Sequence, residues 1–167
     1  DGYITTMALI PLIVETIDLP VIAAGGIMNG NGIAASLALG ASAVQLGTAF
    51  VSTNESAANQ AYRDLLLSDR AFKTEITNVI SGRPARALIN RFTDELRIHD
   101  CDTPGYPMTY DASKALNAAA SAKGSQEFMP MWAGQGAGLS RPMAAHDLMK
   151  ILLHETNEVI GQLKKIH

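Results

Sequence analysis

The stretch from residue 19 to residue 50 constrains the fold more than any other part of the sequence. It begins with an apolar run, residues 19–23, which predicts a short strand buried on both faces, as in a parallel sheet. The pair Gly25-Gly26 follows, and a helix is predicted from about residue 32 to residue 39. A strand, a glycine turn and a helix in this order are typical of an α/β protein.

The end of this stretch repeats the pattern. Asn29 or Asn31 is expected to cap the helix, and Gly40 to end it in the left-handed conformation. Residues 43–46 then predict a second buried strand, and Gly47-Thr48 a second turn. Two parallel strands that both end in such turns place backbone N–H groups at one edge of a sheet, where they bind phosphate.

This arrangement suggests a fold class. In (β/α)8 barrels the phosphate site commonly lies in the loops after strands seven and eight, so we expect the last two strands of such a TIM barrel here. Two strands cannot close a barrel, and the sequence begins with Asp1 instead of Met. We therefore expect the chain to be the C-terminal part of a longer polypeptide.

Composition limits the partners. The 167 residues are 47% hydrophobic and 17% charged, as in a globular protein, and the net charge of −3 argues against a nucleic-acid surface. One cysteine, Cys101, excludes an internal disulfide and fits a reducing, cytoplasmic location. No uninterrupted apolar run approaches the roughly 20 residues of a membrane helix, so no membrane partner is expected.

The other segments predict mostly helices. One is expected over residues 5–17, with Pro11 in its first turn, and Ser52 and Glu55 resemble a capping box that starts another. Residues 72–80 read as a short extended segment and residues 99–107 as a loop. Further helices are expected over residues 85–96, over residues 112–123 with Asp111 as the cap, and over residues 142–165. We thus expect βα units of a barrel over residues 1–70 and a helical extension that builds no sheet over residues 71–167.

Six sequence blocks, in this order, together resemble the nitronate monooxygenase family, formerly called 2-nitropropane dioxygenases. They are PVIAAGGI (20–27), GIAASLALGA (32–41), AVQLGTAF (43–50), NES (54–56), SGRPARALIN (81–90) and MWAGQGAGL (131–139). The resemblance covers nearly the whole chain. It implies a (β/α)8 barrel that holds FMN non-covalently, with this chain supplying the last two strands.

The resemblance also implies where the FMN phosphate binds. The residues carried over by position lie in the two turns: Gly25, Gly26, Gln45, Leu46, Gly47 and Thr48. Backbone N–H groups and the Thr48 hydroxyl would make the contacts. The alternative interpretation is that these glycines only provide the backbone freedom of a tight turn.

The catalytic base of the family is not among the matched residues. In the family it is a histidine in a Gly-Gly-His segment that precedes the matched part, and this sequence contains no such segment. None of the four histidines, His99, His146, His154 and His167, stands in an equivalent place. The base is therefore expected from preceding residues, in the missing N-terminal half of the barrel.

Other chemistry-bearing residues have weaker patterns. His99, Asp100, Cys101 and Asp102 are metal-ligand types, but no second Cys/His pair stands nearby, so we expect no metal. The arginines Arg83 and Arg86 would bind an anion or form surface ion pairs. Residues 132–135 would close over a substrate or pack the extension.

Four functions remain open on the sequence. The leading one is an FMN-dependent oxidoreductase that oxidises alkyl nitronates with O2. An NAD(P)H-dependent flavin reductase acting on quinones or enoyl thioesters is the second. The third is a non-flavin barrel enzyme that binds a substrate phosphate in the same turns, and the fourth is a subunit with only an assembly role.

Overall fold

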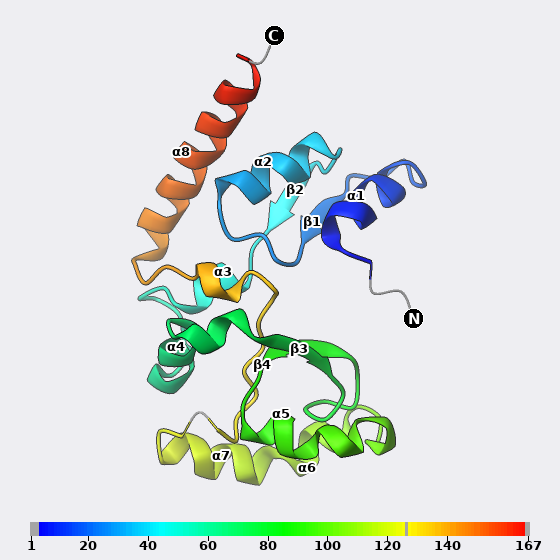
Figure 1. The fold of residues 1–167 in the computed structure, drawn as a ribbon, viewed down its shortest axis with the longest axis vertical. Coiled ribbons are helices and arrows are strands. Elements are labelled where there is room, and N and C mark those ends of the chain that lie inside the picture. The colour runs from blue at the N-terminus through cyan, green and yellow to red at the C-terminus, as the bar shows by residue number, and fades with distance from the viewer. Residues whose placement is uncertain (1–3, 126, 166–167) are drawn as a thin grey trace. The chain divides into compact units, whose positions relative to one another are not determined.

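A computed structural model describes residues 4–125 and 127–165 of the chain (Figure 1). The chain forms two compact units: residues 4–56 together with 139–165, and residues 57–138. The last helix thus belongs with the predicted βα segment. The expected domain boundary at residue 70 stays a prediction.

The first unit contains the predicted βαβ arrangement. Strands β1 (Ile22–Ala24) and β2 (Ala43–Gln45) pair in parallel, and helix α2 (Gly30–Ala38) connects them. The Asn29 side chain accepts a hydrogen bond from the Gly32 N–H at 3.0 Å, which identifies Asn29 as the cap. Gly40 has a φ of +97°, as expected for the end of the helix.

The expectation that both strands are buried on both faces is not met within this chain. Ala23 is buried, but Ile22 is 61% exposed, and Ala24 and Gln45 are exposed as well. The register places Ile22 and Ala24 on the same face as Ala43 and Gln45, because side chains alternate along a strand. One face of this two-stranded sheet therefore packs into the core, and the described residues of this chain leave the other face uncovered.

The helices of the first unit cover the buried face. Helix α1 (Thr6–Val14), α2 and the strands share a core around Ile10, Ala23, Ile27 and Ala41. Helix α8 (Ala145–Leu163) packs on α2. Its Leu148 and Leu152 form a second core cluster with Met28 and with Ala49, which lies in the short helix α3 (Thr48–Val51). Pro11 lies beyond the first turn of α1, contrary to expectation.

The second unit contains most of the remaining elements. In chain order they are α4 (Gln60–Leu66), η1 (Asp69–Phe72), β3 (Thr74–Thr77), β4 (Ala85–Leu88), α5 (Arg91–Leu96), η2 (Arg97–Asp102), α6 (Met108–Ala112) and α7 (Lys114–Ala122). The short helix η3 (Ala137–Leu139) begins in this unit, whose last residue is Gly138. Among residues 4–125 and 127–165, no helix combines the length and hydrophobicity that crossing a lipid bilayer requires.

The helix expected over residues 85–96 is wrong in its first half. Residues 85–88 form strand β4, which pairs antiparallel with β3 and aligns Thr77 with Ala85. Gly82, with a φ of +79°, stands in the connection between the strands. Ala87 also pairs with Trp132, so the second unit builds a small sheet of its own. Pairing on both sides outweighs the helix propensity of alanine and leucine here.

Two expected caps are also wrong. The side chain of Asn59, not Ser52, caps helix α4 by accepting a hydrogen bond from the Tyr62 N–H at 2.9 Å. Glu55 instead accepts a hydrogen bond from the Ala145 N–H at 2.8 Å, at the start of α8. Asp111 lies inside α6, and Ser113 separates α6 from α7.

Candidate functional site

The two glycine turns lie at the same edge of the parallel sheet. Ala24, the last residue of β1, is the register partner of Gln45, the last residue of β2. The segments that follow, beginning at Gly25 and Leu46, therefore leave the sheet side by side. The structure brings together the two turns that the sequence singled out.

The two glycines of the first turn differ in their surroundings: an added Cβ would contact protein at Gly25 and would face open space at Gly26. Gly25 and Gly26 have φ values of +104° and +75°, which side-chain-bearing residues rarely adopt. The Thr6 hydroxyl donates a hydrogen bond to the Gly25 carbonyl at 2.9 Å and lies 3.3 Å from where a Gly25 Cβ would stand. A Cβ on Gly26 would meet nothing within 4 Å. Gly26 therefore borders open space.

The second turn is open for a different reason. Gly47 has a φ of −102°, which any residue adopts, and a Cβ there would meet nothing within 4 Å. Backbone conformation alone therefore does not require glycine at this position. Leu46 packs its side chain into the core, so only its backbone can face a ligand, and Gln45 is exposed. Thr48 is the first residue of α3.

An ion pair supports the loop that follows the first turn. Arg141 donates hydrogen bonds to both carboxylate oxygens of Glu155, at 2.6 and 3.3 Å. The Arg141 guanidinium also donates to the Met28 carbonyl at 3.1 Å, and Glu155 accepts from the Gly30 N–H at 2.8 Å. The hydrogen bond from Arg141 holds the pKa of Glu155 below its ordinary value, and the Gly30 N–H acts in the same direction against partial burial.

The same arginine also contacts the chain beyond the second turn. The Ser52 hydroxyl donates a hydrogen bond to the Arg141 backbone carbonyl at 3.1 Å. Two residues further along in each segment, the Asn54 N–H donates to the Met143 carbonyl at 3.1 Å. The segment before α8 therefore runs alongside the chain that leaves α3.

The metal-ligand types around His99 do not gather into a site. Asp100 accepts hydrogen bonds from the Thr77 hydroxyl at 2.8 Å and from the Asn78 backbone and side-chain nitrogens at 2.7 and 2.9 Å. Burial acts to raise the pKa of Asp100, but these hydrogen bonds together hold it below its ordinary value, and they tie η2 to the end of β3. Cys101 is exposed. Within the described ranges, no group of three His, Cys, Asp or Glu side chains is placed to hold a metal.

The remaining histidines lie on the last helix or beyond it. His146 and His154 are exposed on α8, and the His154 ring lies 3.4 Å from the Glu158 carboxylate, one turn away. His167 lies outside the described residues.

The arginines and Trp132 are held within the second unit. Arg86 donates hydrogen bonds to the carbonyl and the hydroxyl of Thr74, both at 3.1 Å. The Arg83 guanidinium lies over the Tyr106 ring, 5.8 Å from its centroid. Trp132 packs against the core cluster of this unit, and its carbonyl accepts a hydrogen bond from the Tyr62 hydroxyl. These contacts place Trp132 in the packing of the second unit, and the two roles expected for residues 132–135 stay predictions.

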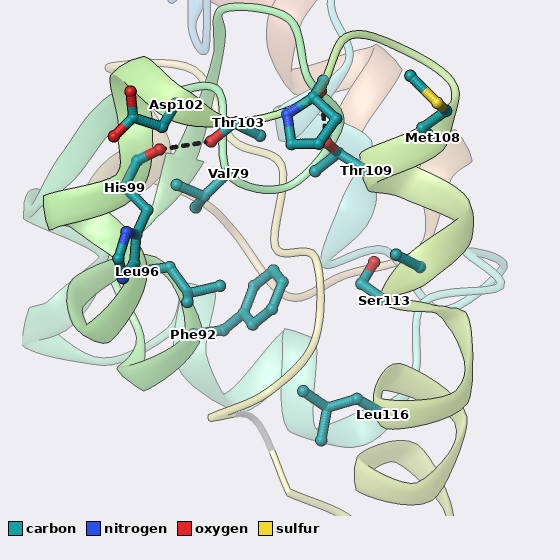
Figure 2. A pocket seen from close by; sticks show the side chains of 12 residues that line it. Val79, Phe92, Leu96, His99, Asp102, Thr103, Met108, Thr109, Ser113 and Leu116 are labelled. Atoms are coloured by element: carbon teal, nitrogen blue, oxygen red, sulfur yellow. Dashed lines mark hydrogen bonds between the residues drawn. The ribbon is translucent and has the colours of Figure 1, made fainter.

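The second unit also contains a cavity of about 680 Å³, shown in Figure 2. Phe92 and Leu96 of α5 line one side of it, and Met108 and Leu116 of α6 and α7 the other. Its hydroxyl groups are bonded to nearby carbonyls: Thr103 to His99 at 2.8 Å, Thr109 to Pro104, and Ser113 to Tyr110 at 3.1 Å. Most of the exposed lining is apolar, and His99 and Asp102 also line the cavity.

Sequence reasoning missed the residues that support the turns. The sequence separations are long: 19 residues from Thr6 to Gly25, 113 from Arg141 to Met28 and 125 from Glu155 to Gly30. An arginine and a glutamate 14 positions apart leave no periodic signal in a single sequence. Only the close approach of α8 to α2 brings them to the loop.

Comparison with known proteins gives consistent results. A family model described as "Nitronate monooxygenase" matches residues 1–155. The nitronate monooxygenase of Pseudomonas aeruginosa is 51% identical over 156 residues, which are 93% of this chain and 44% of that protein. The nitronate monooxygenase of Paraburkholderia phytofirmans is 48% identical over 99% of this chain and 45% of its own length. The chain therefore spans less than half the length of these curated relatives.

Solved structures show the same likeness. The nitroalkane oxidase of Streptomyces ansochromogenes superposes with a TM-score of 0.90 at 39% identity, over 98% of this chain and 48% of that one. FabK from Thermotoga maritima superposes with a TM-score of 0.84 at 30% identity, over 99% of this chain and 53% of that one.

Proposed function

The chain belongs to the nitronate monooxygenase family, and from this membership we propose that it forms the FMN phosphate-binding part of an oxidoreductase. In this proposal the enzyme oxidises alkyl nitronates with O2. The remainder of the active site, including the catalytic base, lies in residues that precede the matched part of the family.

The observation that carries the proposal is the pair of open glycines at one sheet edge. Gly26 and Gly47 both have open space where a side chain would stand, and both follow the ends of paired parallel strands. Backbone amides at such an edge bind phosphate through hydrogen bonds and the local positive dipole. The residues present therefore fit the phosphate of FMN.

The exposed sheet face supports the barrel architecture. Ile22 is 61% exposed on the face opposite the core, beside Ala24 and Ala43. In a (β/α)8 barrel the corresponding face lines the packed interior. We propose that β1 and β2 are the last two strands of such a barrel and that the other strands cover this face.

Each part of this chain then has a defined task. FMN, when bound, supplies the electron-transfer chemistry. Gly26, Gly47 and Thr48 bind its phosphate through backbone N–H groups, with Gly25, Gln45 and Leu46 completing the two turns. Binding at the phosphate end orients the rest of the cofactor without a covalent bond.

Two measurements on the purified natural protein test the proposal. A yellow protein that releases FMN on denaturation, identified by mass spectrometry, is expected. O2 consumption with propionate 3-nitronate or alkyl nitronates, without NAD(P)H, is the expected activity. A colourless protein that binds a sugar phosphate would instead support a non-flavin barrel enzyme.

A second candidate is an NAD(P)H-dependent flavin reductase of quinones or enoyl thioesters. The likeness to FabK at a TM-score of 0.84 supports it, because this fold is not restricted to proteins named for nitronates. Flavin-dependent oxidation of NAD(P)H by these acceptors, with no O2 consumption on nitronates, would favour this candidate.

A further inference from the structure

We infer that Arg141 is a positioning residue for the cofactor phosphate. It holds the two glycine turns at the spacing that one phosphate group requires, and it does so through one hydrogen bond toward each turn. The inference rests on the proposed function, which places the FMN phosphate between these turns.

The first link runs through the side chain. The guanidinium donates a hydrogen bond to the carbonyl of Met28, two residues after Gly26. The partner of Arg141, Glu155, accepts a hydrogen bond from the N–H of Gly30, two residues further along. The loop between the first turn and α2 is therefore fixed at two points by one ion pair.

The second link runs through the backbone. The carbonyl of Arg141 accepts a hydrogen bond from the Ser52 hydroxyl at 3.1 Å, and Ser52 is buried directly after α3. Gly47 caps the other end of this one-turn helix. A displacement of Arg141 would therefore move both turns relative to each other.

Electrostatics gives a second reason for this pair. The Gly30 N–H, at the start of α2, already donates its hydrogen bond to the Glu155 carboxylate, so it does not bind the phosphate. An unpaired carboxylate beside the loop would repel a phosphate dianion. Arg141 offsets the charge of Glu155, and the turns are left to bind the phosphate.

The second unit contains a matched ion pair that serves as a control. Arg70 contacts both carboxylate oxygens of Glu127, at 2.7 and 3.4 Å, and donates to the Ile89 carbonyl at 3.0 Å. Glu127 accepts from the N–H of Arg91, the first residue of α5. The two pairs also have similar exposure, 26% and 31% for Arg141 and Glu155 against 39% and 28% for Arg70 and Glu127.

The test compares FMN with riboflavin, which lacks the phosphate. Dissociation constants for both are measured by flavin fluorescence on the natural protein after removal of its cofactor. Arg141→Met is expected to lower the preference for FMN over riboflavin about tenfold, because the displaced turns would lose roughly one hydrogen bond to the phosphate. Arg141→Lys should recover part of that preference, because lysine keeps the charge but not the fork. Arg70→Met should leave the preference unchanged.

The outcomes separate the two proposals. A wild-type protein that binds FMN no better than riboflavin would overturn the proposed function. A wild-type preference that survives intact in Arg141→Met would overturn only the role of Arg141, and so would an equal loss in Arg70→Met. Where Arg141→Met does not fold, the preference measured in Arg141→Lys decides by the same criterion.

Discussion

Glu155 and Gly30 are joined by a hydrogen bond of 2.8 Å between the carboxylate and the backbone N–H, although 125 residues separate them. A Cβ on Gly30 would stand 2.3 Å from the Glu155 Cβ and 2.4 Å from the Thr156 backbone nitrogen. Helices α2 and α8 therefore touch at a point where one of them has no side chain. This contact fixes the last helix against the loop of the first glycine turn.

Gly30→Ala is expected to destabilise the protein by about 3 kcal/mol, the upper part of the range for overpacking, since backbone atoms of α8 cannot move aside as a side chain would. Urea unfolding at neutral pH measures the change.

Gly161→Ala is the matched control, because Gly161 lies on α8 and a Cβ there would meet nothing within 4 Å. It should stabilise the protein by up to about 1 kcal/mol, since alanine is the better helix former. Equal effects of the two substitutions would contradict the close contact.

Stability should depend on Glu155 at acidic pH. Its pKa is lowered from the ordinary 4.5 in the folded protein, chiefly by the Arg141 hydrogen bond. The unfolded chain therefore binds this proton at a higher pH than the folded chain does. The stabilisation is complete above about pH 4.5 and is lost as the pH falls through the folded-state pKa.

The variant Glu155→Gln has no such proton to bind. The difference in unfolding free energy between wild type and Glu155→Gln should be constant from pH 6 to 8 and shrink below about pH 4.5. Urea titrations across this range measure it. A difference that grows on acidification would show that the carboxylate is not stabilised by its partners.

Gly47→Val should lose FMN and keep the fold. The backbone at Gly47 suits any residue and a Cβ meets no protein atom, so the cost to stability is about 1 kcal/mol, the penalty for valine at a helix cap. The side chain would instead occupy the space assigned to the phosphate. We expect purified Gly47→Val to be colourless with an unchanged far-ultraviolet circular dichroism spectrum.

A second glycine controls for the substitution itself. Gly105, in the second unit, also has open space where its Cβ would stand and no positive φ. Gly105→Val should remain yellow. Full flavin content in Gly47→Val would show that the second turn does not bind the FMN phosphate.

The sequence predicted those features of the site whose contacting residues lie close together along the chain. Asn29 accepts its hydrogen bond from Gly32, three residues away, and Gly40 ends the same helix, so local patterns identified these two residues. The burial of the strands was mispredicted because an apolar run does not reveal whether both faces are covered within the same chain.

Contacts between residues far apart in the sequence explain the other incorrect predictions. Residues 85–88 have good helix formers but become a strand, because β3 lies on one side and Trp132 on the other. Glu55 fits a local capping box, yet its carboxylate binds the first N–H of α8, 90 residues away. Local propensities differ by less than 1 kcal/mol per residue, so such tertiary contacts override them.

Tyr62→Phe should remove a stabilising interaction that fails at alkaline pH. The Tyr62 hydroxyl donates to the Trp132 carbonyl, and burial raises its pKa to about 12. At neutral pH we expect a loss of about 1 kcal/mol, since one hydrogen bond disappears and a carbonyl loses its donor. Because the folded protein keeps this proton between pH 10 and 12 while the unfolded chain releases it, wild-type stability falls over that window and the difference from Tyr62→Phe shrinks.

Urea unfolding from pH 7 to 11 measures this difference, with Tyr110→Phe, at a 38% exposed position, as the control. A Tyr62→Phe difference that does not change with pH would show that the hydroxyl is not buried.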